Sequence, residues 1–271
     1  MKKQGYLLLL LFIAAFALTG CGLLQEPEEA SGPLEAIPLE TQSAGVVAEP
    51  TQPPVATAME ATAEPTVPVE ATAEAAPATE ALPTDAPTEP PASTAAVYTI
   101  DSAASQVRFQ LDEDLRGVRT TVVGTTNQVA GQLSLNLADL SQTQVGVIQI
   151  NACTLATDNN FRNRAIQNEI LDTGSFEFIT FTPTGIEGLP AAAAIGEPVT
   201  FTLVGDLTIR DVTLPATFTV EATAVSESQI TGSATAVVNR ADFGLQIPSV
   251  PSVANVEEEV ELYIDFTANA S

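Results

Sequence analysis

Short apolar runs with a hydrophobic residue at every second position dominate the chain from residue 97 to its end. Val107, Phe109 and Leu111, for example, alternate with polar residues. A period of two places such side chains on one face of a β-strand, which is then buried. Glycine, asparagine, aspartate and proline separate the runs, as is typical of turns. The pattern predicts about eight strands, at residues 97–100, 105–111, 128–137, 144–151, 176–186, 198–209, 214–225 and 229–239, with a last one at 259–268.

One helix is predicted between the fourth and fifth runs. Asp158 or Asn159 can cap its first turn. The apolar residues that follow have helical spacing and form a stripe of Phe161, Ala165, Ile166 and Ile170. We expect this helix to pack across one end of the domain at residues 97–271. So many antiparallel strands favour a closed barrel or a sandwich, because closure removes the exposed strand edges.

The stretch before this domain has a different composition. From residue 26 to about residue 96 it consists mainly of alanine, proline, threonine and glutamate, without apolar periodicity. Such a segment buries too little surface to offset the entropy of ordering it. We therefore predict a disordered linker over residues 21–96. About 70 flexible residues span about 45 Å, so its expected role is to hold the domain clear of a membrane.

The N-terminus has the features of an export signal. Lys2 and Lys3 precede an apolar run at residues 6–18 that is shorter than the about 20 residues of a membrane span. The run ends in Leu18-Thr19-Gly20-Cys21, which resembles the lipobox of bacterial lipoproteins. We predict a signal peptide at residues 1–20 and a membrane anchor on acylated Cys21, with two or more acyl chains needed for stable binding. The domain then lies in the periplasm or at the outer cell surface.

Charge and composition exclude several classes of function. The net charge of −25 argues against a nucleic-acid partner, which requires a clustered basic surface. The chain has no histidine, so the usual proton shuttle and the commonest metal ligand are missing. No nucleophile with a base at recognisable spacing is visible, although paired carboxylates remain open. We predict no enzyme activity, no metal and no cofactor. We interpret Cys153 as a buried structural thiol.

Five segments of the domain carry distinctive motifs, namely Tyr98-Thr99-Ile100-Asp101, Thr157 to Arg162 with Ala165-Ile166, Phe178-Ile179-Thr180-Phe181, Gly205 to Thr213 with Pro215, and Asn239 to Gly244. Together and in this order they resemble the YceI-like family of secreted lipid-binding proteins. The resemblance implies an all-β, closed, eight-stranded antiparallel lipocalin-like barrel with one short helical insert. It also implies an elongated apolar interior that holds a polyisoprenoid or an isoprenoid quinone. The family's usual insert carries a histidine, whereas this chain reads Phe161-Arg162-Asn163-Arg164.

The candidate ligand-binding residues follow from these expectations. They are the aromatic residues Phe109, Phe161, Phe181, Phe201 and Phe218, which would line the interior, and Arg162 and Arg164, whose guanidinium groups suit a phosphate or carboxylate at its mouth. The alternatives are a filled core for the aromatic residues, and surface solvation or an ion pair with Glu169 for the two arginines. Arg210 and Arg240 are expected to form structural pairs, for instance with Asp206 or Asp242.

Two functions remain open from the sequence. The first is non-catalytic binding, storage or transport of a long-chain isoprenoid lipid in the bacterial cell envelope. Burial of each methylene contributes about 0.8 kcal/mol, so a long tail needs few polar contacts. The second is a packed barrel that acts as an interaction module at the cell surface without a lipid ligand. The sequence leaves open whether the domain forms a homodimer.

Overall fold

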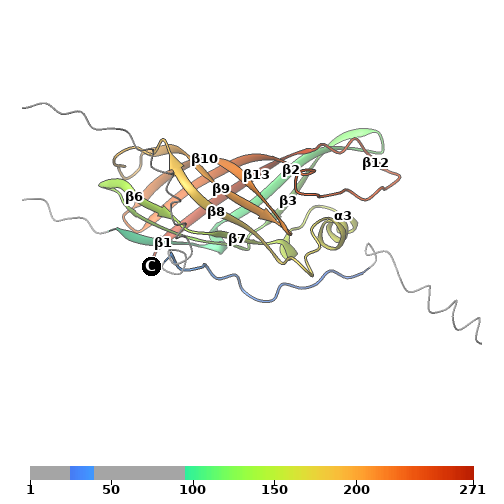
Figure 1. Ribbon diagram of the computed structural model, residues 1–271, viewed down its shortest axis with the longest axis horizontal. Helices are drawn as coiled ribbons and strands as arrows, with labels where there is room; N and C mark the ends of the chain where they lie inside the picture. Colours follow the sequence, from blue (N-terminus) through green and yellow to red (C-terminus); the bar gives the residue numbers. More distant parts are fainter. Residues whose placement is uncertain (1–24, 40–94) are drawn as a thin grey trace, which may run out of the picture. The chain divides into compact units, whose positions relative to one another are not determined.

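The computed structural model of the chain describes residues 25–39 and 95–271. These residues form an all-β fold with one short helix (Figure 1). The strands are β1 (Ala96–Ile100), β2 (Gln106–Leu115), β3 (Val118–Thr126), β4 (Val129–Ala130), β5 (Gln132–Asn136), β6 (Asp139–Val145), β7 (Ile148–Asn151), β8 (Phe178–Glu187), β9 (Pro198–Ile209), β10 (Val212–Ser226), β11 (Gln229–Asn239), β12 (Val253–Ala254) and β13 (Glu259–Ala270). The predicted signal peptide and the lipidation site at Cys21 lie outside the described residues.

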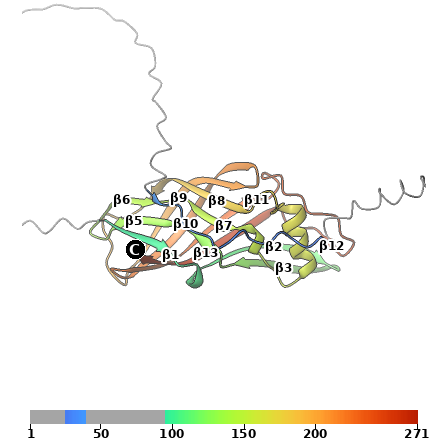
Figure 2. The ribbon, with the colours of Figure 1, turned by 90° about the horizontal axis from the view of Figure 1, so that it is seen from below.

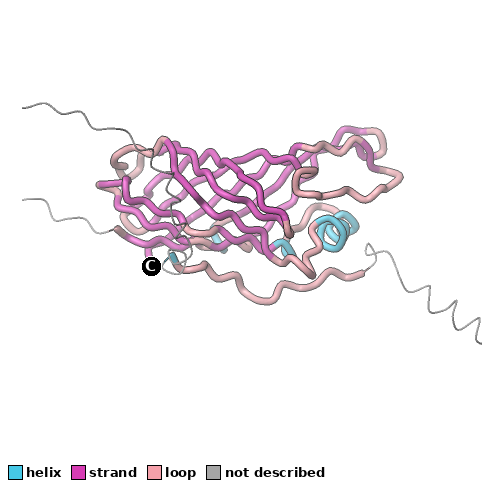
Figure 3. Tube along the Cα trace, viewed as in Figure 1, coloured by secondary structure: helices cyan, strands magenta, loops and turns pink. Residues whose placement is uncertain are grey.

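The described strands belong to one antiparallel sheet that curls into an open half-barrel (Figure 3). Its main path runs β4-β7-β8-β9-β10-β11-β13-β1-β5-β6, and β2 pairs with β3, β12 and β13. The path has two ends, so these ladders do not describe the closed eight-stranded ring that the sequence predicts. The difference arises at Gly131, which divides the run predicted at 128–137. Its halves, β4 and β5, pair with different neighbours, β7 and β1.

The predicted strands agree with the structure best where the alternation is longest. β9 and β11 begin and end at the predicted residues. β3 was not predicted. It follows β2 through the two-residue turn Arg116–Gly117, whose φ angles of 53° and 81° are both in the left-handed region. That combination is typical of a hairpin turn whose twist matches the flanking strands.

A close contact between a glycine and a phenylalanine joins these two strands. Gly124 of β3 lies opposite Phe109 of β2. A Cβ atom at Gly124 would lie 2.2 Å from Cε1 of Phe109, so the ring occupies the space that any other residue would need. A glycine inside a strand often marks such a close approach. The Phe109 ring therefore covers the backbone of Gly124.

The predicted helix is confirmed. α3 (Asn160–Ala165) continues into a π-helical turn, η5 (Ile166–Ile170). Asn159 caps it, because its side-chain oxygen accepts hydrogen bonds from the backbone N–H groups of Phe161 at 2.9 Å and Arg162 at 3.2 Å. Ile166 is buried as expected, whereas Phe161 is 65% exposed. None of the described helices is long and apolar enough to cross a membrane.

Residues 25–39, here called the N-terminal segment, lie against the domain (blue in Figures 1 and 2). The side chain of Asn168 in η5 donates a hydrogen bond to the carbonyl of Gln25 at 2.9 Å. Ser31 donates from its backbone N–H and its hydroxyl to Glu177, at 2.8 and 3.0 Å. These contacts fall within the range predicted to be a disordered linker, and composition gave no sign of them.

Candidate functional site

A cavity of about 900 Å³ lies at the end of the sheet next to the helix. β2, β3, α3, η5, β13 and the loop at residues 243–256 form its walls. The walls are predominantly aliphatic and aromatic, with Phe109, Leu111, Ile166, Phe243 and Leu262 among them. Its size falls within the range of about 300–1,000 Å³ that is typical of small-molecule sites. We call it the helix-end cavity.

The mouth of the helix-end cavity is marked by lining residues that are also exposed to solvent. Phe161 of α3 and Val118 at the start of β3 are each 65% exposed. Arg116 lines the cavity at the adjoining turn and is exposed as well. The loop after β11 adds apolar residues such as Ile247 and Val250 to the wall. The mouth therefore presents apolar side chains at the entrance to the interior.

A buried ion pair is the main polar feature of this cavity. Arg162 Nη2 lies 2.9 Å from Glu113 Oε1, and the two side chains are 17% and 7% exposed. The other terminal nitrogen of Arg162 lies 2.6 Å from Asp158, whose side chain is 86% exposed. Both Arg162 and Glu113 line the cavity. The pair thus provides a charged donor and a charged acceptor inside an otherwise apolar site.

A second, smaller cavity of about 120 Å³ lies toward the other end of the sheet. Its lining is almost entirely apolar and includes Phe181, Phe201 and Phe218. The rings of Phe181 and Phe218 pack edge to face, with centroids 4.8 Å apart. Such a pair contributes about 0.5–1.5 kcal/mol beyond its buried area. The small cavity therefore has a rigid aromatic wall.

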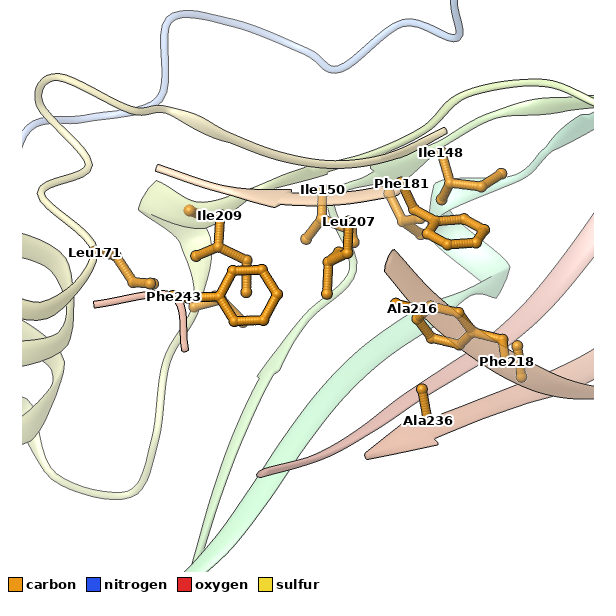
Figure 4. Close-up of a cluster of buried hydrophobic side chains, with 14 of the residues drawn as sticks. Ile148, Ile150, Leu171, Phe181, Leu207, Ile209, Ala216, Phe218, Ala236 and Phe243 are labelled. Carbon is orange, nitrogen blue, oxygen red and sulfur yellow. The ribbon is translucent and has the colours of Figure 1, made fainter. Parts of the chain in front are cut away.

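A packed layer separates the two cavities. Figure 4 shows Leu171, Ile209 and Phe243 near the helix, Ile148, Phe181 and Phe218 on the other side, and Ile150, Leu207, Ala216 and Ala236 between them. We call these last four residues the partition. They are all buried and line neither cavity. The interior is thus not the single elongated space that the family resemblance implies.

The structure divides the predicted ligand-binding residues between these spaces. Phe109, Phe161 and Arg162 line the helix-end cavity, whereas Phe181, Phe201 and Phe218 line the small one. Arg164 lines neither cavity, although it lies on the same helix as Arg162. Within the described part of the chain it forms no ion pair. Arg162 pairs with Glu113 and not with Glu169.

The expected partners of the two turn arginines were wrong. Arg240 pairs with Glu258 at 2.7 Å and not with Asp242, and it donates to the carbonyl of Leu245 at 3.0 Å. It thus joins the loop after β11 to the start of β13, where both form the cavity wall. Arg210 makes no ion pair with Asp206. Its φ of 56° turns the β9–β10 hairpin, and its guanidinium donates to the carbonyl of Ile170 at 3.4 Å.

Sequence reasoning missed Glu113 as a site residue. It follows Phe109 and Leu111 at the same spacing of two, so its side chain shares their buried face. A charged residue at a core position of a strand was the available signal, because such residues are rarely buried without a partner. Arg162, 49 residues later in the chain, supplies that partner.

Cys153 lies outside both cavities. Its thiol is half-buried, and burial raises its pKa above the ordinary value. Sγ lies 3.7 Å from the carbonyl oxygen of Thr173. These features agree with the interpretation of a structural thiol, because only the thiolate is a strong nucleophile. Over residues 25–39 and 95–271, no three acidic, cysteine or histidine side chains are arranged to hold a metal ion.

Comparisons with known proteins identify the family. No curated protein matches the chain. The structure of a polyisoprenoid binding domain from Saccharophagus degradans, implicated in plant cell wall breakdown, is similar with a TM-score of 0.51 and 15% identity, covering 64% of this chain and 98% of that one. BcnA from Burkholderia cenocepacia has a TM-score of 0.51 and 18% identity, covering 63% and 99%. The model of the YceI-like domain matches residues 98–268, which is more than half of the chain, and the protein therefore belongs to the YceI-like family.

Proposed function

We propose that this protein is a non-catalytic binding protein for a long-chain isoprenoid lipid, and that the helix-end cavity is the binding site. The observation that carries the proposal is a cavity of about 900 Å³ with apolar walls, an apolar mouth and one buried ion pair. The similar Saccharophagus degradans domain is described as polyisoprenoid binding. An amphiphile with a branched hydrocarbon tail and a compact polar end matches this combination of features.

Burial of the tail supplies most of the affinity in this proposal. Each methylene taken out of water contributes about 0.8 kcal/mol, so a five-carbon isoprene unit contributes about 4 kcal/mol as an upper value. A few units are sufficient for tight binding once the entropy cost of association is offset. The alternative of a packed interaction module requires a filled interior, which does not agree with the size of the helix-end cavity.

The polar end of the ligand would be recognised near Arg162 and Glu113. Arg162 can donate to a phosphate or a carbonyl oxygen, and Glu113 can accept from a hydroxyl group. Arg116 adds a second guanidinium at the mouth. This arrangement suits either a prenyl phosphate or a quinone, both of which present oxygen acceptors at the end of an isoprenoid tail.

The remaining parts of the proposal concern the whole chain. We propose that residues 1–20 direct export, that acylated Cys21 anchors the protein in the cell envelope, and that the sheet closes into a barrel. The sequence supports the anchor through its lipobox. Closure is supported at Gly131, which stands between β4 and β5. β4 pairs with β7 and β5 pairs with β1, so this one stretch of chain links both sides of the ring. The hydrogen bond from the Ile100 N–H to the carbonyl of Gly131, at 3.0 Å, extends the pairing with β1 to this residue.

Extraction of the native protein tests the ligand. We expect organic extracts of the purified full chain to contain a stoichiometric isoprenoid lipid by mass spectrometry. Two matched variants then locate the site: Ala165→Phe places a phenyl ring in the helix-end cavity next to the mouth, and Ala222→Phe places one in the small cavity. We expect the first variant to lose the lipid and the second to retain it. An extract without lipid, or loss only in Ala222→Phe, would contradict the assignment of the site.

A further inference from the structure

The contacts of the N-terminal segment define its direction along the domain. Gln25 is held by Asn168 in η5, next to the helix-end cavity. Ser31 is held by Glu177 just before β8, and the N–H of Leu39 donates to the side chain of Gln132 in β5 at 3.3 Å. β5 contributes residues to the small cavity. The segment therefore starts at the helix-end cavity and finishes beside the other one.

The residues on either side of positions 40–94 are both fixed on the sheet. Leu39 contacts Gln132, and Gln132 pairs with Thr99 in β1, the strand that begins at Ala96. The flanking residues therefore lie beside the same pair of strands, β1 and β5. Because the docked segment precedes this stretch, the length of residues 40–94 does not determine how far Cys21 can lie from the domain. The role of a long spacer, predicted from composition, does not follow once the segment is docked.

The distance available to the anchor is instead set by a few residues. Cys21 precedes Gln25 by four positions, and a fully extended chain covers at most about 14 Å over that length. Phe161, at the mouth, is seven residues before Asn168 along the same helical stretch, which corresponds to about 10 Å. An acylated Cys21 is thus limited to about 25 Å from Phe161 plus the reach of the side chains. The about 45 Å span of a free linker no longer applies.

The surface around the mouth suits a membrane. Phe161 and Val118 are the two most exposed large hydrophobic residues among the described residues, and both lie at this end. Arginines gather there too. Arg116, Arg162 and Arg240 line the cavity, Arg119 and Arg164 lie on the elements that carry Val118 and Phe161, and Arg210 contacts Ile170. Arg108 is the exception and stacks on Tyr263, 4.2 Å from the ring centre. Arg119, Arg162 and Arg240 are each paired with acidic residues of the same end, so the exposed apolar side chains, and not a net positive charge, favour contact of this end with a membrane surface.

We infer that the N-terminal segment orients the lipidated protein so that the mouth of the helix-end cavity rests on the membrane that holds Cys21. Phe161 and Val118 then enter the interfacial region of the bilayer, where exposed apolar residues are stabilised. A lipid passes between bilayer and cavity without crossing bulk water. The inference rests on the proposed anchor at Cys21 and extends the proposed binding function by naming the surface from which the ligand is taken.

Single tryptophans test this orientation, because the chain has no tryptophan of its own. The variants are Phe161→Trp and Val118→Trp at the mouth, and Ile195→Trp as the matched control. Ile195 is 51% exposed and lies in the β8–β9 connection, beside residues that line the small cavity. The full lipidated chain carrying each variant is reconstituted in phosphatidylcholine vesicles with brominated acyl chains. Circular dichroism confirms cooperative unfolding of each variant.

We expect several-fold stronger bromine quenching, with a blue-shifted emission, for the two mouth tryptophans than for the control. The combined change Ser31→Pro and Asn168→Ala removes the hydrogen bonds that hold Ser31 and Gln25, lies outside the strands, and should abolish the difference. Deletion of residues 50–85 should leave it unchanged. Equal quenching at all three positions, or a difference that disappears on the deletion and persists on undocking, would overturn the inference.

Separate measurements distinguish the membrane orientation from the anchor at Cys21 and from lipid binding. A chain that fails to sediment with vesicles refutes the anchor, and the inference falls with it. The comparison of Ala165→Phe with Ala222→Phe needs no membrane, so lipid binding is measured independently. Retained lipid binding together with equal quenching would overturn the orientation alone.

Discussion

The buried pair Glu113–Arg162 allows a sharp test of the cavity's polar side. We consider Arg162→Met, which keeps the length of the side chain and removes its charge. The Arg162 nitrogen lies 2.9 Å from the Glu113 oxygen. At an effective dielectric constant of about 20, the attraction between unit charges at this distance is about 6 kcal/mol. Most of it offsets desolvation, because Glu113 is only 7% exposed at its side chain.

Removal of one partner leaves the other charge buried and unpaired, which typically costs about 3–5 kcal/mol. Arg162 also interacts with Asp158, but that residue is 86% exposed and adds little. We therefore expect Arg162→Met to lower the free energy of unfolding by about 3 kcal/mol. For a domain of this size, that corresponds to a decrease in Tm of about 6–12 °C. Urea denaturation followed by circular dichroism measures the change.

Arg164→Met is the matched control. Arg164 lies on the same helix, and no ion pair forms at it within the described residues, so its replacement should change stability by less than about 0.5 kcal/mol. The double variant Glu113→Leu with Arg162→Met replaces the whole pair by apolar groups in an apolar cavity. We expect it to recover most of the lost stability. Equal stability of Arg162→Met and Arg164→Met would refute the view that this ion pair is buried.

Three further predictions concern the segment, the thiol and the sheet. A hydrogen bond from the backbone N–H of Ser31 lowers the pKa of Glu177, so this contact stabilises docking above the ordinary carboxyl pKa of about 4.3 and is lost as the pH falls through the lower folded value. The protection factors of residues 25–39, in which the intrinsic pH dependence of amide exchange is divided out, should accordingly fall on acidification, and Glu177→Gln should remove this dependence. Burial raises the pKa of Cys153, so in a Cys21→Ser chain we expect slow reaction with a disulfide reagent at pH 8 and fast reaction after denaturation; fast labelling of the folded chain would contradict this. Gly124→Val should push the Phe109 ring into the helix-end cavity, costing about 1–3 kcal/mol in a urea titration and weakening lipid binding; unchanged binding would argue against the cavity as the site.

The strands that could be predicted from the sequence are those with a long apolar alternation. β9 and β11 have such patterns and were located to the residue. β3 was missed because the face that carries its cavity-lining residues Val118, Thr120 and Val122 has a threonine in the middle and continues to Gly124, so the apolar alternation is too short. The missing side chain at Gly124 is the counterpart of the Phe109 ring that covers it. The apolar period of one strand gives no information about space that is occupied by a side chain of the neighbouring strand.

The candidate site was predictable by residue type and less so by arrangement. Composition and the family resemblance led to inward aromatic residues and to two arginines of the helix; the aromatic residues and Arg162 line cavities, whereas Arg164 does not. Which arginine faces the interior depended on Glu113, a partner far away in the sequence. The docked N-terminal segment could not be predicted either. Its contacts are a few backbone and amide hydrogen bonds that leave no apolar period in the sequence.

The partition between the two cavities has a consequence for ligand length. Under the proposed function, a tail that enters at the mouth stops against Leu207 and its neighbours, so the depth of the cavity sets how many isoprene units fit inside. Chains longer than this depth must leave their surplus outside, beside the exposed Phe161 ring. Leu207→Ala would remove part of the partition and join the two cavities, so the preferred ligand would shift toward longer isoprenoid chains.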